Sequence, residues 1–203
     1  MLPLRCSPAC ERNWQPIGDV LSRWLPPSGR LLEIGSGSGQ HASYLIDQLP
    51  SWQWQTSDKQ PDTRSIMAWR EQARDYDRIL APKSLDVGDD LQIASLPADY
   101  DAVLTVNTLH IMSWSLAKTF FSVAKTLARA NAVLFVYGPM HANGEPTSDS
   151  NAAFDHSLRR ESALMGIRDI EAIRAAAADA GWLELSHYHM PANNQMLVWE
   201  CTA

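Results

Sequence analysis

Cysteine, long apolar runs and clustered basic residues are scarce or missing in this chain of 203 residues. Its three cysteines are Cys6, Cys10 and Cys201, and so sparse and odd a set is typical of free thiols in a reducing compartment. Cys6 and Cys10 lack the third cysteine, at the position of Asn13, that an iron–sulfur cluster of the radical-enzyme type needs. The sequence therefore favours free thiols over a disulfide framework and excludes such a cluster.

No apolar run approaches the roughly 20 residues that a membrane span needs. The first residues, MLPLRCSPACERN, place proline and arginine where the apolar core of a signal peptide would lie. We therefore expect a cytoplasmic protein with no membrane partner.

A concentrated basic face is also missing. The formal net charge is −6, and Arg159 and Arg160 form the only adjacent basic pair. Proteins that bind nucleic acids usually carry such a face, so the sequence argues against a nucleic-acid substrate and favours a small-molecule acceptor. The six histidines show no ligand spacing with cysteine or acid, so no metal is expected. Nothing in the sequence indicates an oligomeric state.

The elements that are present alternate along the chain. A length of 203 residues with no repeat or linker fits one domain, 1–203. Apolar spacing predicts helices over 14–25, 39–50, 62–76, 113–129, 151–163 and 169–180. Short apolar runs predict strands over 30–35, 52–58, 78–87, 101–106, 131–138, 182–190 and 195–201. This alternation predicts an α/β fold with a mostly parallel, seven-stranded sheet, helices on both faces and a C-terminal antiparallel hairpin.

Glycine is concentrated in the stretch LLEIGSGSGQH, residues 31–41, where Gly35, Gly37 and Gly39 alternate with serines. The stretch joins the first strand to a helix, at the sheet edge where ligands of such folds bind. Bare backbone lets a ligand approach closely, and a helix N-terminus favours a carboxylate or phosphate. The loop therefore predicts a ligand site, although a tight turn without a ligand would use the same residues.

The spacing separates two ligand classes. Dinucleotide-binding loops need G-x-G-x-x-G, whereas this loop has G-x-G-x-G preceded by the acid Glu33. That pattern resembles the first motif of the class I S-adenosylmethionine-dependent methyltransferases, which have a Rossmann-like fold. The resemblance implies S-adenosyl-L-methionine as cofactor, held by residues that include Glu33, Gly35, Ser36, Gly37 and Gly39.

Acids after the next two strands agree with this interpretation. Asp58 ends the second strand about 20 residues after the glycines, where an acid binds ribose hydroxyls. The resemblance places Asp86 at the adenine amino group and Asn107 beside the donor. Each has a plainer alternative: Glu33 as a buried structural acid, Asp58 as a helix cap and Asp86 as a turn residue.

Motifs over nearly the whole chain resemble a small methyltransferase-like family of unknown function, of the methyltransferase-like protein 26 type. They are SPACERN, EIGSGSGQH, NTLHIM, YGP, SNAAFD, GIRD and MPANN. Cys10 departs from the pattern, which more often has alanine there. The resemblance implies a donor and a fold but names no substrate.

The N-terminal 30 residues are expected to form a lid segment and a helix. SPACERN would fold over the donor, with Arg12 reaching its carboxylate as a charge-assisted pair. The alternative is a disordered or merely packing tail.

Three residues are candidates for catalysis on the acceptor side: His110, Tyr137 and Asp155. His110 follows the fourth strand, and an imidazole that titrates near neutrality suits a general base. Packing, turn or capping roles would explain the same residues. NTLH also lacks the Pro-Pro-aromatic sequence of enzymes that methylate amino groups of nucleic acids.

The function expected from these features is methyl transfer from S-adenosylmethionine to an unidentified small molecule. A protein that binds S-adenosylmethionine or S-adenosylhomocysteine without catalysis is one alternative. An NAD(P)-dependent oxidoreductase is another.

Overall fold

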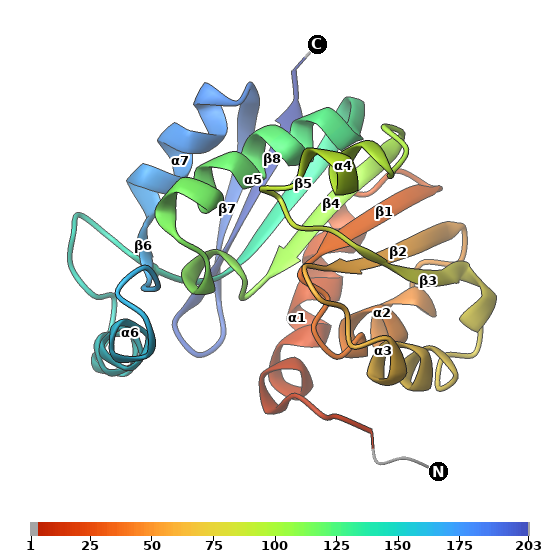
Figure 1. Cartoon of the computed structure of the whole chain (residues 1–203), viewed down its shortest axis with the longest axis horizontal. Coiled ribbons are helices and arrows are strands. Elements are labelled where there is room, and N and C mark those ends of the chain that lie inside the picture. Colours follow the sequence, from red (N-terminus) through yellow and green to blue (C-terminus); the bar gives the residue numbers. More distant parts are fainter. Residues whose placement is uncertain (1–3, 203) are drawn as a thin grey trace.

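The computed structural model, which describes residues 4–202, is built on a twisted sheet in the order β3-β2-β1-β4-β5-β8-β7 (Figure 1). A two-residue strand, β6, pairs with the end of β5. The strands are β1 (Gly29–Ile34), β2 (Trp52–Asp58), β3 (Ile79–Ser84), β4 (Tyr100–Val106), β5 (Ala128–His141), β6 (Arg168–Asp169), β7 (Trp182–Met190) and β8 (Asn194–Cys201).

Helices cover both faces of this sheet. In Figure 1, α1, α2 and α3 lie on one side and α4, α5 and α7 on the other. The α-helices are α1 (Pro8–Trp24), α2 (Gln40–Ile46), α3 (Thr63–Arg70), α4 (Asp90–Ala94), α5 (Trp114–Leu127), α6 (Asp149–Glu161) and α7 (Ile170–Asp179). Short 3₁₀ turns, η1 (Tyr76–Arg78) and η2 (Leu109–Ile111), precede β3 and α5.

Side-chain alternation along the strands creates two cores. In β4, Val103 belongs to the core that includes Phe120 of α5, whereas the neighbouring Leu104 belongs to the core that includes Ile17 of α1. Because successive strand side chains point to opposite faces, buried strands that read as continuous apolar runs supply both cores.

The direction of strand order reverses at β1. β1 pairs in parallel with β2 on one side and with β4 on the other, and Leu32 lies opposite both Gln55 and Val103. The carboxyl ends of these strands, at Ile34, Asp58 and Val106, therefore meet at one edge of the sheet. Parallel sheets bind ligands at such a switch point.

The predicted α/β, Rossmann-like fold with a mostly parallel sheet is confirmed, and so is the C-terminal antiparallel hairpin. The hairpin inserts β8 between β5 and β7, so the last strand is interior and β7 is the edge. Several boundaries differ: α1 begins at Pro8 rather than at residue 14, and α2 ends at Ile46 rather than at residue 50. β5 continues to His141, and α3 stops at Arg70 because its guanidinium binds the carbonyls of Tyr76 and Ile79 and turns the chain into β3.

No helix among residues 4–202 is both long and apolar enough to cross a membrane. All three cysteines are free thiols: Cys6 is exposed, and Cys10 and Cys201 are buried.

Gly39 has a packing role in this fold. It lies just before α2 with φ +85°, and a Cβ at this position would lie 2.9 Å from the Ile66 Cα of α3. We expect Gly39→Ala to lower the free energy of unfolding by about 2–5 kcal/mol, since left-handed backbone costs about 1–2 kcal/mol and overpacking about 1–3 kcal/mol.

The matched control is Gly144→Ala, because Gly144 has φ +78° and a Cβ there would enter open space. It should lose only the backbone contribution of about 1–2 kcal/mol. Denaturant unfolding of both variants measures the difference, and equal losses would show that the contact with α3 costs nothing.

Candidate functional site

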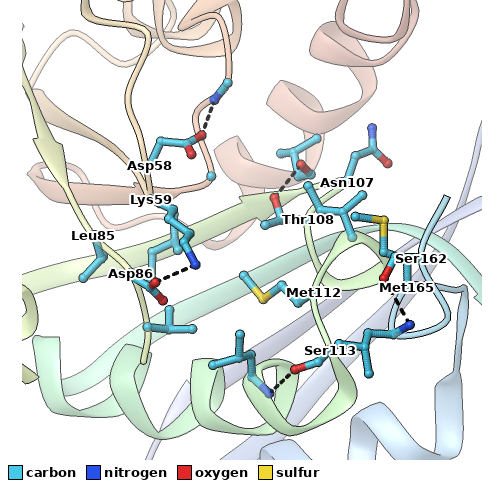
Figure 2. Close-up of a pocket in the computed structure, with 18 residues that line it drawn as sticks. Asp58, Lys59, Leu85, Asp86, Asn107, Thr108, Met112, Ser113, Ser162 and Met165 are labelled. Atoms are coloured by element: carbon cyan, nitrogen blue, oxygen red, sulfur yellow. Dashed lines mark hydrogen bonds and ion pairs between the residues drawn. The ribbon is translucent and has the colours of Figure 1, made fainter. Parts of the chain in front are cut away.

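The main cavity of the described chain opens at the switch point, at the carboxyl ends of β1 to β4 (Figure 2). Its volume is about 540 Å³, within the range of small-molecule sites. It is lined by Ile34, Gly35, Gly37, Asp58, Lys59, Leu85, Asp86, Val87, Val106, Asn107, Thr108, Ile111, Met112, Ser113, Leu116, Ser162, Leu164 and Met165.

The glycine loop forms one wall of this cavity. Gly35 has φ +84°, and a Cβ there would lie 2.5 Å from Thr108 Oγ1, so only glycine fits against the loop after β4. Gly37 has φ +55°, and a Cβ there would meet no atom of residues 4–202 within 4 Å, so its bare backbone faces open space. One glycine is thus required by packing and the other leaves room at the cavity wall.

Asp58 ties this loop to the end of β2. Its Oδ2 accepts a hydrogen bond of 3.0 Å from the Gly37 N–H, and its side chain lines the cavity. The Asp58 carboxylate therefore holds the backbone at Gly37, and it does not cap a helix. The cap of α3 is Asp62, whose Oδ1 accepts from the Ser65 N–H at 3.1 Å.

Asp86 lines the cavity at the end of β3. Lys59 Nζ lies 2.8 Å from Asp86 Oδ2, and the Gly88 N–H donates to Oδ1 at 3.0 Å. The hydrogen bond from Lys59 is the main reason that the pKa of Asp86 is lowered, with help from Gly88. Sequence reasoning missed Lys59, although it directly follows Asp58.

Asn107 follows β4 and also lines the cavity. Its φ is +55°, which asparagine tolerates better than most residues, and its N–H donates to the Tyr137 carbonyl at 2.9 Å. This turn directs the loop after β4 across the mouth of the cavity.

Glu33 lies behind the glycine loop and lines no part of the cavity. It is fully buried, and one oxygen accepts a hydrogen bond of 3.1 Å from Trp54 Nε1. The other, Oε1, has no hydrogen-bond partner among residues 4–202 and lies 3.9 Å from His41 Nδ1. Burial raises the pKa of Glu33 to about 7, against smaller opposing effects of Ser36 and Trp54.

His41 connects this acid to the N-terminal helix. Its Nε2 lies 2.8 Å from Asn13 Oδ1 of α1, and burial lowers its pKa to about 4. Polar side chains therefore link β1, α2 and α1 directly behind the glycine loop.

Ser36 and Gly39 are also internal. Ser36 Oγ accepts from the Ser57 N–H at 3.1 Å, which holds the loop against β2. Neither residue lines the cavity. Within the glycine motif, Gly35 and Gly37 therefore form the cavity wall, whereas Ser36 and Gly39 serve packing.

The N-terminal segment packs on α2 and α3. Ser7 N–H donates to Gln40 Oε1 at 2.7 Å, and Trp69 Nε1 donates to the Arg5 carbonyl at 3.0 Å. No residue between 4 and 30 lines the main cavity, and the exposed Arg12 lies on α1. Residues 1–3 of the expected lid lie outside the described residues.

The structure does not bring His110, Tyr137 and Asp155 to the main cavity. His110 and Tyr137 line a separate void of about 10 Å³ between β5 and the loop after β4. The His110 ring packs against Phe154 with centroids 5.3 Å apart, and burial, then the charge of Arg168, lowers its pKa to about 4. Burial also raises the pKa of Tyr137.

Asp155 acts as a structural anchor of α6. Its Oδ2 accepts from Arg159 Nε at 2.7 Å, and its Oδ1 accepts from the Ile167 N–H at 2.6 Å. Burial raises its pKa, but these hydrogen bonds and the charge of Arg159 together hold the pKa below its ordinary value.

Several wall residues were missed by sequence reasoning. Met112, Ser113 and Leu116 follow His110 and could have been found by extending the loop after β4. Ser162, Leu164 and Met165 come from the segment between α6 and β6, and no local pattern in the sequence connects them with the glycine loop.

No three side chains of the kinds that bind metals lie close enough within residues 4–202 to hold a metal ion.

Residues 4–201 match the family described as "Protein of unknown function (DUF938)". The chain belongs to this family. Its description assigns no activity, so family membership leaves the role of the cavity open.

Solved methyltransferases share the fold of this family member. An O-methyltransferase family protein from Burkholderia thailandensis has a TM-score of 0.77 at 18% identity, over 96% of this chain and 58% of that one. An O-methyltransferase family 2 protein from Planctomyces limnophilus, in complex with apigenin, has 0.76 at 16%, over 92% and 61%. Human N-acetylserotonin methyltransferase, in complex with SAM, has 0.74 at 12%, over 96% and 53%.

This chain thus spans between about half and three fifths of the length of those proteins. At these identities the likeness shows the fold alone, which this chain shares with these methyltransferases.

The raised pKa of Glu33 predicts a pH dependence of stability. Between its ordinary value of 4.5 and about 7, the folded protein binds one proton more than the unfolded chain at this carboxyl. The free energy of unfolding therefore falls as pH rises through this window. Glu33→Gln removes the titration, so the stability of the wild type relative to this variant should fall by up to about 3 kcal/mol.

Denaturant unfolding of both proteins at pH 5, 6, 7 and 8 measures this change. The other buried groups titrate in both proteins, so the difference isolates Glu33. A difference that stays constant from pH 5 to 8 would mean that Glu33 is ionised in the fold over this whole range.

Proposed function

We propose that this protein is an S-adenosylmethionine-dependent methyltransferase that acts on a small molecule. The observation that carries the proposal is the convergence of Gly37, Asp58 and Asp86 on one cavity at the switch point of a methyltransferase-like sheet. We also propose that the protein is of the methyltransferase-like protein 26 type. The same proposal includes one domain over 1–203, a cytoplasmic location and an acceptor that is not a nucleic acid.

The residues of the cavity fit the donor. The open space at Gly37 is a cradle that any side chain would fill, and Asp58 beside it offers a carboxylate for two ribose hydroxyls. Asp86 would accept from the adenine amino group, between the apolar side chains of Leu85 and Val87. Asn107 would lie beside the methionine portion.

When bound, S-adenosylmethionine supplies a methyl group on a sulfonium: the acceptor's oxygen or nitrogen bonds to it, the C–S electron pair stays on sulfur, and the nucleophile's proton is released. This chain would orient both reactants and exclude water. Orientation alone supplies a large part of the rate in such reactions. His110 would remain a neutral imidazole outside the cavity wall, so we propose that it positions the loop after β4, of which it is a part.

The N-terminal segment is proposed as a lid that moves with the glycine loop. Gln40 and His41, which follow the loop, bind Ser7 and Asn13. Arg12 stands one residue from Asn13 and would reach the donor's carboxylate if α1 shifted toward the cavity.

Incubation with methyl-labelled S-adenosylmethionine and a fractionated cell extract tests the proposal. Label in a small-molecule product that depends on the protein supports methyl transfer. Donor binding without any labelled product would instead indicate a sensor, and binding of NADPH in place of the donor would indicate an oxidoreductase.

Asp58→Ala should weaken binding of S-adenosylmethionine by roughly 10- to 100-fold, because hydrogen bonds to a charged group contribute about 1.5–3 kcal/mol. Calorimetric titration measures the affinity. Asp19→Ala, which removes an exposed acid of α1, is the matched control and should bind as the wild type does. Equal affinities in the two folded variants would remove Asp58 from the donor site.

Gly37→Val should abolish donor binding while the far-ultraviolet circular dichroism stays near native. The branched side chain would occupy open space at the cavity wall, and its backbone conformation costs about 1–2 kcal/mol in stability. Thermal unfolding separates this loss of stability from loss of the ligand space. Normal binding by the variant would mean that no ligand approaches Gly37.

A further inference from the structure

The cavity has two ends of different chemistry. Among residues 4–202, the charged side chains that line it are Asp58, Lys59 and Asp86, all from the ends of β2 and β3. The opposite end is formed by Ile111 and Met112 after β4 and by the segment Ser162–Met165 after α6. Figure 2 shows the charged groups on one side, with Met112 between them and Met165.

We infer that this opposite end is the acceptor subsite and that it takes an uncharged, flat aromatic molecule that carries a hydroxyl or amino group. The inference rests on the proposed function, because it assigns the acceptor to the part of the cavity that the donor's polar groups do not need.

Hydrogen bonds join the two segments of this end into one wall. Gly166 N–H donates to the His110 carbonyl at 2.9 Å, and Arg168 Nη2 donates to the carbonyls of both Leu164 and Met112. Arg168 also lies over the Trp114 ring, 5.9 Å from its centroid. Because the planar guanidinium spans both carbonyls, the segment after α6 is held at the cavity rather than free in solvent.

Gly166 lets the segment after α6 pack closely against α6 itself. Gly166 has φ +146°, and a Cβ there would lie 2.8 Å from the Arg159 guanidinium and 2.9 Å from Asp155 Oδ1. The carboxylate of Asp155 holds the next residue, Ile167, by its N–H. The anchor on α6 therefore fixes where Leu164 and Met165 stand.

The side chains at this end favour an apolar ligand. Ile111 is 50% exposed and Leu164 is 66% exposed, so a ligand seated between them would remove apolar surface from water. Among residues 4–202, the only cation that lines the cavity is Lys59 at the other end, so a charged ligand here would lose its hydration without gaining a partner.

Two methionines specify an aromatic ligand more closely. Met112 and Met165 present flexible, polarisable thioethers to the cavity from its two segments. Sulfur makes favourable contacts with aromatic ring edges, and methionine adapts to rings of different shape. Ser113 and Ser162 at the same end could hydrogen-bond the acceptor's polar group.

The test uses 2-naphthol as the probe, with its fluorescence measured on the full chain saturated with S-adenosylhomocysteine. We expect binding by the wild type and a loss of at least about tenfold in Leu164→Glu, because the ring would then face an unpaired carboxylate. The matched control is Leu91→Glu on α4, where the leucine is 84% exposed and lines none of the cavities described above. The anion 2-naphthoate should bind at least about tenfold more weakly than 2-naphthol.

The outcomes distinguish a failure of the acceptor subsite from a failure of the methyltransferase proposal. If S-adenosylhomocysteine displaces 2-naphthol, this end belongs to the donor and the subsite is wrong. Failure of 2-naphthol to bind the wild type, or equal binding by Leu164→Glu and Leu91→Glu, overturns it as well. If S-adenosylhomocysteine itself does not bind, the methyltransferase proposal fails, while the comparison of the two leucine variants without it still decides whether this end binds an aromatic molecule.

Discussion

The carbonyl of Ser57 organises the functional edge of the sheet. It accepts hydrogen bonds from the N–H groups of both Gly35 and Ser36, at 3.0 and 2.9 Å, and so fastens the glycine loop to the end of β2. A loop that turns this sharply needs left-handed backbone at Gly35, and Thr108 then fills the space where a side chain would be. The end of β4 is therefore set by the same turn, and the cavity exists because three strand ends are held around it.

Behind this loop the molecule buries an acid. Glu33 is fully buried at the end of β1 with one satisfied oxygen, and burial shifts its pKa toward neutrality. His41 and Asn13 continue the polar contact to α1. An apolar residue would avoid that cost, so the retained carboxyl links the packing of the N-terminal helix to the loop that forms the cavity wall.

The cavity combines segments that are far apart in the chain. Its charged end comes from residues 58–86 and its apolar end from residues 111–113 and 162–165. Arg168 joins the two apolar segments through their carbonyls, and Asp155 fixes the turn that brings Arg168 there. The charged end and the apolar end of the cavity are thus separated by strand order, since loops on the two sides of β1 face one another across the switch point.

The sequence by itself determined the alternation of strands and helices, the position of the glycine loop and the acids at the strand ends. These follow from local spacing: apolar periodicity, glycine at a strand-to-helix turn, and Asp58 and Asp86 directly after buried strands. Local spacing says nothing about which glycine faces a cavity. Only the tertiary structure separated Gly37, which has open space, from Gly39, which packs on Ile66.

The same limit applies to the residues that follow β4 and β5. His110 and Asp155 are residue types that suit catalysis, but the direction of a side chain depends on what packs over it. Phe154 covers His110, and the two carboxylate oxygens of Asp155 bind Arg159 and Ile167. Leu164 joins the cavity only because hydrogen bonds hold its segment against the loop after β4. Such long-range contacts leave no periodic trace in a single sequence, so only the fold could decide them.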